Sequence, residues 1–158
     1  MNDINPAELH SLFDYKDGVL TWKQGRKKGR VAGSLKPTGY TVVEINNKNI
    51  MAHRLVWMMH NGSFEGFIDH IDGNRSNNKI ENLRLATVLQ NSWNRKNNSN
   101  NRTGVKGVHQ IKANNKYHAR ICIGNKRLVL GTFDDLELAE LVVMEARDKY
   151  HKEFANHG

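Results

Sequence analysis

The chain of 158 residues has few of the residue types that cross-link a protein or anchor it in a membrane. It has one cysteine, Cys122, two prolines and 8% aromatic residues, and its mean hydropathy is −0.69. A single cysteine excludes an internal disulfide and any zinc site built from several cysteines. No apolar run approaches the roughly 20 residues that a membrane helix needs. We therefore expect a modest core that depends on close packing or on a bound partner.

Targeting signals are also missing from the start of the sequence. The segment MNDINPAELH has no basic stretch followed by an apolar one, so we expect no secretory signal. A lone cysteine fits a reducing compartment, and the expected location is the cytoplasm. We expect no membrane association and no small-molecule cofactor.

Basic charge is concentrated in one segment of the chain. The net charge is +8 and the isoelectric point is about 9.7. Residues 95–134 hold nine Lys or Arg and one Asp, whereas residues 135–158 hold six acidic and three basic residues. DNA or RNA would be attracted to the first segment and repelled by the second. A solvated basic face without a partner is the alternative.

Hydrophobic periodicity predicts an α+β protein. The first block is expected to contain strands at 18–23 and 39–45, a hairpin through 45–50, and a helix over 53–62 that ends at Gly62. The second block is expected to contain, in order, a strand at 66–70, a turn at 71–78, an extended piece at 80–85 and a helix at about 87–96 that starts at Thr87.

The third block follows a polar stretch that predicts a linker at 95–103. Beyond it we expect three short strands and one amphipathic helix, at 107–111, 117–124, 127–133 and about 135–154. The expected domains are residues 1–94, with a motif core at 66–94, and residues 104–158.

The stretch FIDHIDGNRSNN places Asp69 and His70 at the end of an apolar run, directly before a Gly-Asn turn. Neighbours on a regular strand point to opposite faces, so these two side chains converge only if the strand ends, twists or bulges there. His70 is either an exposed strand-end residue or a general base beside a metal. Asn82 and Asn91 follow later, but 20 of the 158 residues are Asn, so neither is informative alone.

The order of HRLVW, IDHIDGNRSNNKIENLR and QNSWNR resembles the HNH endonucleases, in the variant whose third histidine is an asparagine. The resemblance covers about residues 40–95 and implies a ββα-metal finger preceded by a β-hairpin region. It implies that His70 is the general base and that Asn82 holds its ring. It also implies that Asp69 and Asn91 hold one Mg²⁺ or Mn²⁺ ion. As alternatives, the two asparagines are ordinary turn and helix-surface residues.

The third block resembles the Apetala or ethylene-response-factor DNA-binding domain, three strands packed on one helix, through GVKGV, KYHARI and LGTFDDLELA. That resemblance implies contact with double-stranded DNA through the sheet, although Tyr117 stands where the family usually has Trp. The expected DNA-binding residues of the whole chain are basic: Arg26, Lys27, Lys28, Arg75, Arg95, Lys96, Lys106, His109, Lys112, His118, Arg120, Lys126 and Arg127.

Taken together, the resemblances imply a homing-type endonuclease of a bacterial or phage-infected cell that cuts or nicks duplex DNA. Two rivals stay open. One is a sequence-specific DNA-binding protein or regulator without catalysis, and the other is an RNA-binding or RNA-cleaving module.

Overall fold

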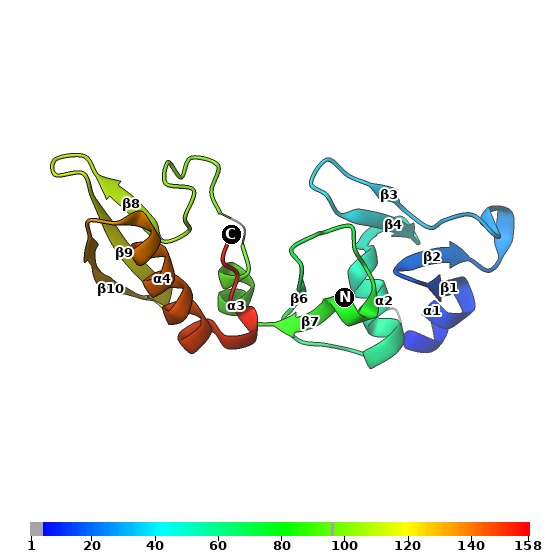
Figure 1. The fold of residues 1–158 in the computed structure, drawn as a ribbon. Helices are drawn as coiled ribbons and strands as arrows, with labels where there is room; N and C mark the ends of the chain where they lie inside the picture. Colours follow the sequence, from blue (N-terminus) through cyan, green and yellow to red (C-terminus); the bar gives the residue numbers. More distant parts are fainter. Residues whose placement is uncertain (1–4, 96) are drawn as a thin grey trace. The chain divides into compact units, whose positions relative to one another are not determined.

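The chain forms two compact units of mixed helix and sheet (Figure 1). The structure is a computed structural model and describes residues 5–95 and 97–158. Unit 1 comprises Met1–Thr87 and unit 2 comprises Val88–Gly158. The division therefore falls before the linker that the sequence predicts at 95–103. None of the helices among the described residues is long and apolar enough to cross a membrane.

Unit 1 begins with a short helix that the periodicity did not predict. Helix α1 (Pro6–Leu12) starts at Asn5, whose Oδ1 accepts a hydrogen bond from the Glu8 amide at 2.8 Å. Asparagine at this position followed by proline is a favoured helix start. The signal is therefore present in the sequence, but seven residues are too few to show a helical period.

The rest of unit 1 consists of three small antiparallel sheets, two 3₁₀ turns and one longer helix. The sheets are β1 (Phe13–Lys16) with β2 (Val19–Trp22); β3 (Ser34–Leu35) with β4 (Thr41–Ile45) and β5 (Lys48–Met51); and β6 (Phe67–His70) with β7 (Leu83–Ala86). The 3₁₀ turns are η1 (Gly25–Lys27) and η2 (Ile80–Asn82). The helix is α2 (Ala52–Asn61), which ends at Gly62 with φ 78° as predicted.

Helix α2 carries the centre of the core of unit 1. Leu55 and Val56 are fully buried there and belong to the same cluster as Leu9, Phe13 and Ile68. Ile68 is the residue before Asp69 on β6, so burial of the strand fixes the two residues that follow it. The core thus positions the end of β6, where the sequence predicts a catalytic pair.

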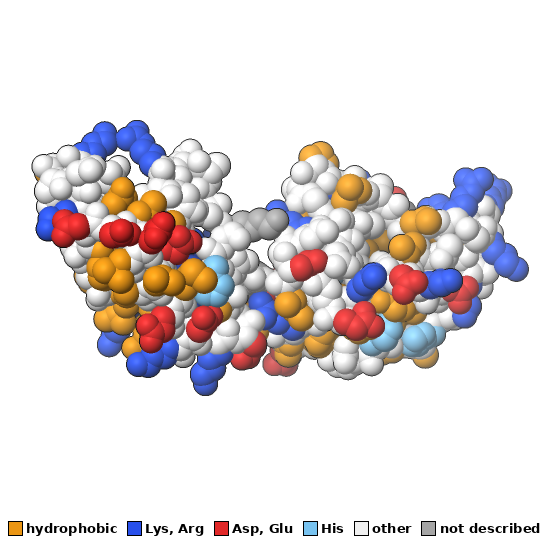
Figure 2. Space-filling view, in the orientation of Figure 1, with side chains coloured by type: hydrophobic (Ala, Val, Ile, Leu, Met, Phe, Trp, Pro, Cys, Tyr) orange, Lys and Arg blue, Asp and Glu red, His pale blue; other side chains and the backbone are white. Residues whose placement is uncertain are grey.

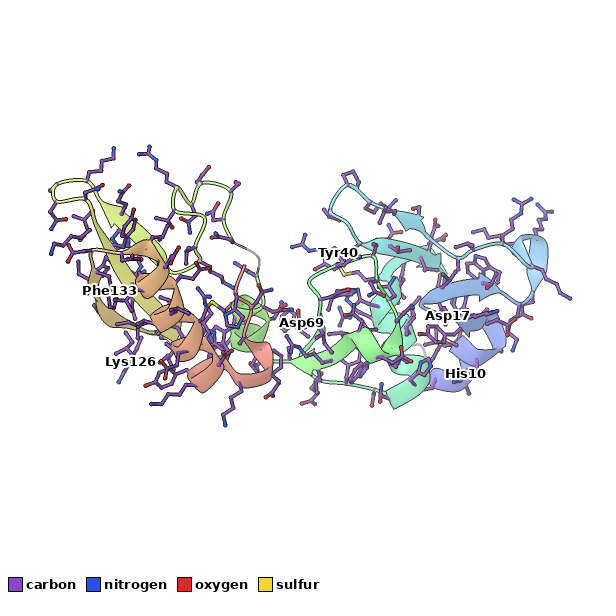
Figure 3. The ribbon with its side chains drawn as sticks, in the orientation of Figure 1. His10, Asp17, Tyr40, Asp69, Lys126 and Phe133 are labelled. Carbon is purple, nitrogen blue, oxygen red and sulfur yellow. The ribbon has the colours of Figure 1, made fainter. Side chains whose placement is uncertain are left out.

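Unit 2 begins with α3 (Val88–Trp93) and continues as a three-stranded sheet backed by a helix. The strands are β8 (Val108–Ile111), β9 (Lys116–Ile123) and β10 (Lys126–Phe133), in the order β10-β9-β8, and all three were predicted. Lys126 and Phe133 mark the two ends of β10 (Figure 3). Helix α4 (Leu136–His151), followed by the turn η3 (Lys152–Phe154), begins at Asp135, whose side chain accepts from two amides of its first turn.

One face of this sheet packs against α4, as the alternation predicts. Ala119 and Val108 are paired in register and buried together with Val143 of α4. The neighbouring register pair, His109 and His118, therefore lies on the opposite face. Their rings are 4.9 Å apart. The sheet thus has one apolar face and one face of polar and basic residues.

Most of the predicted linker is a folded loop that side-chain hydrogen bonds hold in place. Asn101 Nδ2 donates to Asn97 Oδ1 at 3.0 Å and to the Val105 carbonyl at 2.7 Å. Asn97 Nδ2 donates to the Gly104 carbonyl at 2.7 Å. Side-chain amides therefore replace the backbone hydrogen bonds that a helix or strand would supply, and residues 97–104 form a folded loop of unit 2.

Candidate active site

The site begins at the last two residues of β6. Asp69 and His70 are 6% and 4% exposed, so both are buried at the point where the strand ends. In the hairpin, Asp69 lies opposite Arg84 and His70 lies opposite Leu83 on β7. The sequence indicated that the two side chains can converge only if the strand ends, twists or bulges there, and β6 ends at His70.

The ring of His70 is held by Asn78. His70 Nε2 and Asn78 Oδ1 are 3.1 Å apart, and Asn78 is 4% exposed. A carbonyl oxygen can only accept, so Nε2 carries the proton and the neutral ring has its lone pair on Nδ1. Sequence reasoning missed this partner, although the Asn-Asn pair at 77 and 78 is part of the motif that it singled out.

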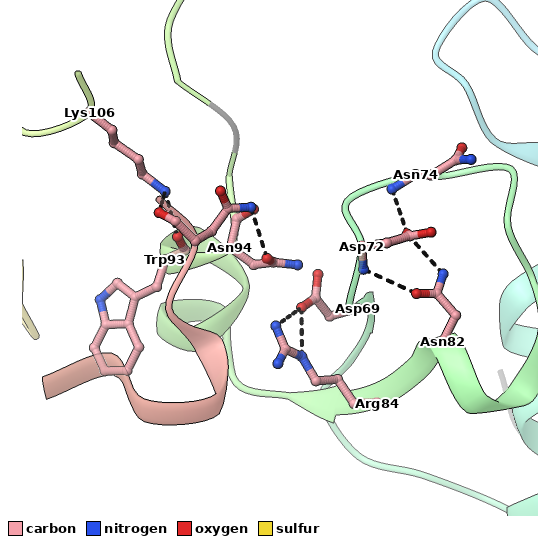
Figure 4. Close-up of polar contacts among 9 residues, drawn as sticks. Asp69, Asp72, Asn74, Asn82, Arg84, Trp93, Asn94 and Lys106 are labelled. Carbon is pink, nitrogen blue, oxygen red and sulfur yellow. Dashed lines mark hydrogen bonds and ion pairs between the residues drawn. The ribbon is translucent and has the colours of Figure 1, made fainter. Parts of the chain in front are cut away.

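The expectation that Asn82 holds His70 is not met, because Asn82 uses its side chain on the turn instead. Its Oδ1 accepts from the Asp72 amide at 3.1 Å, and its Nδ2 donates to Asp72 Oδ1 at 2.9 Å and to the Asn77 carbonyl at 2.8 Å (Figure 4). Asp72 Oδ1 also accepts from the Asn74 amide at 2.8 Å, which closes the turn locally. Asn82 therefore holds the turn at Asp72 and at Asn77, the residue directly before Asn78.

His70 on β6 lies in a cluster of rings with His53 of α2 and with Tyr40, which comes directly before β4. The ring centroids of His70 and His53 are 4.9 Å apart, and Tyr40 lies 5.4 Å from His53 and 6.0 Å from His70. Figure 3 shows Tyr40 between β4 and the turn after β6. His53 is 5% exposed. The sequence motif HRLVW contains His53 but gives no sign that it contacts His70.

Burial sets the charge of both imidazoles. Burial, with help from His70 and Arg54, lowers the pKa of His53 to about 3. Burial also lowers the pKa of His70 below its usual value, although the bond to Asn78 and the carboxylates of Asp69 and Asp72 act in the other direction. Both rings are therefore neutral at pH 7, and a neutral imidazole can accept a proton.

Asp69 forms an ion pair across the hairpin. Its Oδ2 accepts from Arg84 Nε at 3.1 Å and from Arg84 Nη2 at 3.0 Å (Figure 4). The two side chains are 7% and 14% exposed, so the buried carboxylate is matched by a positive charge. This cation is a second residue that sequence reasoning did not include.

The fourth motif residue, Asn91, lies on α3 in unit 2. Asp69 and Asn91 offer a carboxylate and an amide oxygen, which are donors that Mg²⁺ and Mn²⁺ accept. Among residues 5–95 and 97–158, no group of three or more His, Cys, Asp or Glu side chains is arranged to bind a metal. Each of the two side chains thus has donor chemistry that suits a hard cation, and the described residues contain no dense carboxylate or histidine cage.

The predicted DNA-binding residues of unit 1 occupy two places. Arg26, Lys27 and Lys28 are exposed at η1, and Lys27 Nζ lies 5.3 Å from the centre of the Trp22 ring. Lys27 lines a hollow of about 330 Å³, together with Arg30 and Lys36. Arg75 lies over the Tyr40 ring at 5.0 Å and donates to the Thr38 carbonyl at 3.0 Å, so it joins the turn to the neighbouring loop.

In unit 2 the expected residues are divided between the open face of the sheet, its turns and the start of the unit. His109, His118, Arg120 and Arg127 share the face opposite α4 by their register. Lys112, Lys126 and Arg95 are exposed. Lys96 lies outside the described residues.

Lys106 does not fit the expectation. Its ammonium donates to the carbonyls of Trp93 at 2.8 Å, Arg95 at 2.5 Å and Asn156 at 3.0 Å (Figure 4). Burial and the charge of Arg147 lower its pKa to about 8. All three donors of the ammonium are thus used inside unit 2, and the residue is structural.

Comparison with known proteins gives a family and three relatives. Residues 51–93 match the HNH endonuclease family. The chain is 35% identical over 107 residues to protein 3.8 of Escherichia phage T7, a match that covers 65% of the chain and 86% of that protein. It is 38% identical over 82 residues, and 51% identical over 49 residues, to two uncharacterized HNH endonucleases of Acanthamoeba polyphaga mimivirus, L245 and L560. No solved structure matches the chain.

The extent of these matches differs. The chain covers most of the T7 protein but only 24% of each mimivirus protein. The family match contains His53, Asp69, His70 and Asn82, which all lie in unit 1, and Asn91 on α3. Residues 51–93 therefore form a domain of the HNH endonuclease family, and the chain as a whole is related to protein 3.8 of phage T7.

Proposed function

We propose that this protein is a metal-dependent DNA endonuclease of the homing type, which hydrolyses phosphodiester bonds with His70 as general base. The observation that supports this most directly is the hydrogen bond from His70 Nε2 to Asn78 Oδ1 at 3.1 Å. This bond places the proton of the neutral ring on Nε2 and its lone pair on Nδ1, in a segment that matches a nuclease family. Family membership alone would leave the catalytic role of His70 without a physical basis.

The hydrolysis of a phosphodiester needs an activated water, neutralised charge at phosphorus and a stabilised leaving oxygen. In this proposal Nδ1 of His70 takes the proton of the attacking water. Burial keeps the ring neutral, and Asn78 keeps its orientation. Asn82 keeps the turn closed so that Asn78 stays at the ring. The residues of unit 1 thus orient and deprotonate the nucleophile.

Asp69 and Asn91 would hold one divalent cation, Mg²⁺ or Mn²⁺, through their side-chain oxygens. When bound, the cation supplies charge stabilisation to the transition state and to the leaving 3′ oxygen. Arg84 orients the Asp69 carboxylate through its two hydrogen bonds. A single carboxylate and an amide leave the remaining coordination positions for phosphate oxygens and water.

We also propose that unit 2 binds duplex DNA with the sheet face that carries Arg120 and Arg127. These residues share a face with His109 and His118, opposite the helix. Basic side chains on a sheet suit the phosphate backbone, and a ribbon of strands can enter a major groove. Unit 2 would thereby raise the local concentration of DNA for the nuclease residues.

The test is cleavage of plasmid and phage DNA with and without Mg²⁺, followed by mapping of the ends. Wild-type protein is expected to cut or nick only with the metal. His70→Ala is expected to abolish cutting and to leave the DNA dissociation constant within a few-fold. His60→Ala is the control, because His60 is exposed on the same unit, where it hydrogen-bonds to the Val56 carbonyl and contacts Tyr15.

Full cutting by His70→Ala would remove His70 as the base. Tight binding of duplex DNA by wild-type protein without cutting at any metal concentration would instead support the rival, a DNA-binding regulator. Preferential binding or cleavage of RNA would support the other rival. Because His70 is buried, the unfolding midpoint of the variant is measured beside its activity, and His70→Gln provides a second variant that keeps a polar side chain.

A further inference from the structure

Unit 2 contains a hollow of about 560 Å³ between the Asn-rich loop 97–103 and the first two strands of the sheet. One wall is formed by the loop. The other wall is formed by residues of β8, its following turn and β9, among them His109, Lys112 and Arg120. In Figure 2, Lys and Arg side chains gather beside the two loops that follow α3 and β8. The hollow is therefore bordered by the open face of the sheet, which the proposed function assigns to DNA.

The loop wall has a fixed shape because three of its polar side chains are used to build it. Asn97, Asn101 and Thr103 are half-buried. Asn97 and Asn101 bond to each other and to the Gly104 and Val105 carbonyls, and Thr103 Oγ1 bonds to the Val108 carbonyl at 3.0 Å. The last bond attaches the loop to the start of the sheet. The spacing between the two walls is therefore set by the fold of unit 2.

Three residues between them have side chains that are exposed to solvent. Asn98, Asn100 and Arg102 are exposed and line the hollow. Their side chains present amide and guanidinium donors on the outside of the loop, and Asn98 Oδ1 also accepts from the Asn100 amide at 3.3 Å. Ser99 is also exposed but does not line the hollow. The loop thus presents exposed donors to the hollow from a framework held by its half-buried side chains.

The chemistry of the walls selects an anion. Arg102, Lys112 and Arg120 line the hollow, and none of its described lining residues is Asp or Glu. Arginine, lysine and asparagine are the side chains that most often donate to phosphate oxygens of nucleic acids. A volume of 560 Å³ falls in the range of roughly 300–1,000 Å³ found for sites of small ligands. It admits a few nucleotides of one strand and not the width of a duplex.

We propose that the loop 97–103 and the β8–β9 face together form a groove that holds the sugar–phosphate backbone of one strand of duplex DNA. Arg102 and Arg120 contact phosphates from opposite walls, and Asn98 and Asn100 donate to the backbone between them. The inference rests on the proposed function, since it states where on unit 2 a strand of the proposed DNA ligand lies. It makes the Asn-rich segment a part of the binding surface.

The test is the affinity of the full chain for a fluorescein-labelled duplex oligonucleotide of mixed sequence, measured by anisotropy in EDTA at several salt concentrations. Arg102→Ala is expected to weaken binding several-fold and to lower the slope of log affinity against log salt by about 0.9, the value for one lost phosphate contact. Asn98→Ala and Asn100→Ala are expected to weaken binding a few-fold each, with the slope unchanged.

Two matched controls separate the groove from general effects. Ser99→Ala changes the same loop outside the hollow, and Lys149→Ala removes one exposed positive charge from α4 of the same unit. Both are expected to bind like wild type. Arg102, Asn98 and Asn100 are exposed, so their variants are expected to keep the wild-type unfolding midpoint.

The outcomes distinguish this inference from the function on which it rests. One outcome is that Arg102→Ala binds DNA as tightly as Lys149→Ala while Arg120→Ala binds it more weakly. That result would overturn the proposed groove and leave DNA binding by the sheet face standing. If neither arginine variant weakens binding, unit 2 does not bind DNA through this face and both are wrong. Tighter binding of a single-stranded RNA of the same length than of the duplex would also overturn the groove as a DNA site.

Discussion

Which ring nitrogen of His70 carries the proton depends on Asn78, eight positions further along the chain. Asn78 accepts from Nε2 and is itself buried, so the ring has a fixed tautomer and orientation before any substrate binds. A neutral amide fixes the ring without the charge that a carboxylate would add. Burial can therefore keep the imidazole neutral at pH 7.

Asn78→Ala is expected to lower kcat by about 10- to 100-fold, which is the range for the loss of a residue that orients a catalytic or ligating imidazole. Asn78→Asp keeps an acceptor at the same place and is expected to retain more activity than Asn78→Ala. Steady-state cleavage and DNA affinity are measured for both. Asn74→Ala is the control, because its side chain bonds only within the turn. Equal rates for Asn78→Ala and Asn74→Ala would contradict the role of Asn78.

The buried His53 predicts how the stability of the protein depends on pH. Its pKa is about 3 in the folded protein and about 6.5 when unfolded. The unfolded chain therefore binds more protons between these values, and stability falls as pH is lowered from about 6.5 towards 3. One proton contributes a slope of up to about 1.4 kcal/mol per pH unit.

His53→Gln removes this titration, so its free energy of unfolding is expected to depend less on pH than that of wild type. The measurement is urea unfolding at pH 7, 5.5 and 4 for both proteins, and only the difference between them is interpreted. Carboxylates that titrate in the same range contribute equally to both. Parallel pH profiles would show that His53 is not held neutral by burial.

At the scale of elements, α3 belongs to unit 2 because three contacts hold it there. Its last residue, Trp93, stacks on His151 at 4.3 Å with 8° between the rings. Asn156 Nδ2 donates to the Asn94 carbonyl at 2.8 Å and to Asn94 Oδ1 at 3.1 Å. Lys106 then bonds to the carbonyls at positions 93, 95 and 156. One ammonium thus joins the end of α3 to the C-terminal segment.

Lys106→Met keeps the aliphatic stem and removes these three donors. It is expected to lower the free energy of unfolding of unit 2 by about 2 kcal/mol, because three carbonyls, two of them in part-buried bonds, lose a charged donor. Lys112→Met is the matched change at an exposed position and is expected to weaken DNA binding with little effect on stability. Denaturant unfolding and DNA affinity are measured for both. Unchanged stability of Lys106→Met would return Lys106 to the set of DNA-binding residues.

The elements also show what the sequence could and could not predict. The strands of the third block were predicted because each alternates polar and apolar residues and ends at a turn. Its helix was predicted because apolar residues recur at helical spacing after Asp135. The choice of Asn78 over Asn82 as the partner of His70 was not predictable, because it depends on the path of the turn between them. The structural role of Lys106 was hidden for a similar reason, since its partners are carbonyls up to 50 residues away.

At the scale of the whole molecule, positive charge is present in both units. Unit 1 has twelve Lys or Arg and nine Asp or Glu, and unit 2 has twelve and seven. Each unit has its own hydrophobic cluster, so each presents its basic side chains from a separately folded surface. Neutralising phosphates from both surfaces would release more counterions than either surface alone.

Binding of the full chain to duplex DNA is therefore expected to weaken steeply with salt, with contributions from both units. Arg26→Ala in unit 1 and Arg120→Ala in unit 2 are each expected to lower the slope of log affinity against log salt by about 0.9. The double variant is expected to lower it by about 1.8, because the two sites have no residue in common. The measurement is a salt titration in EDTA for the four proteins. A double variant with the slope of Arg120→Ala alone would show that the basic loop of unit 1 does not touch DNA. A flat salt response in wild type would argue against phosphate contacts by either unit.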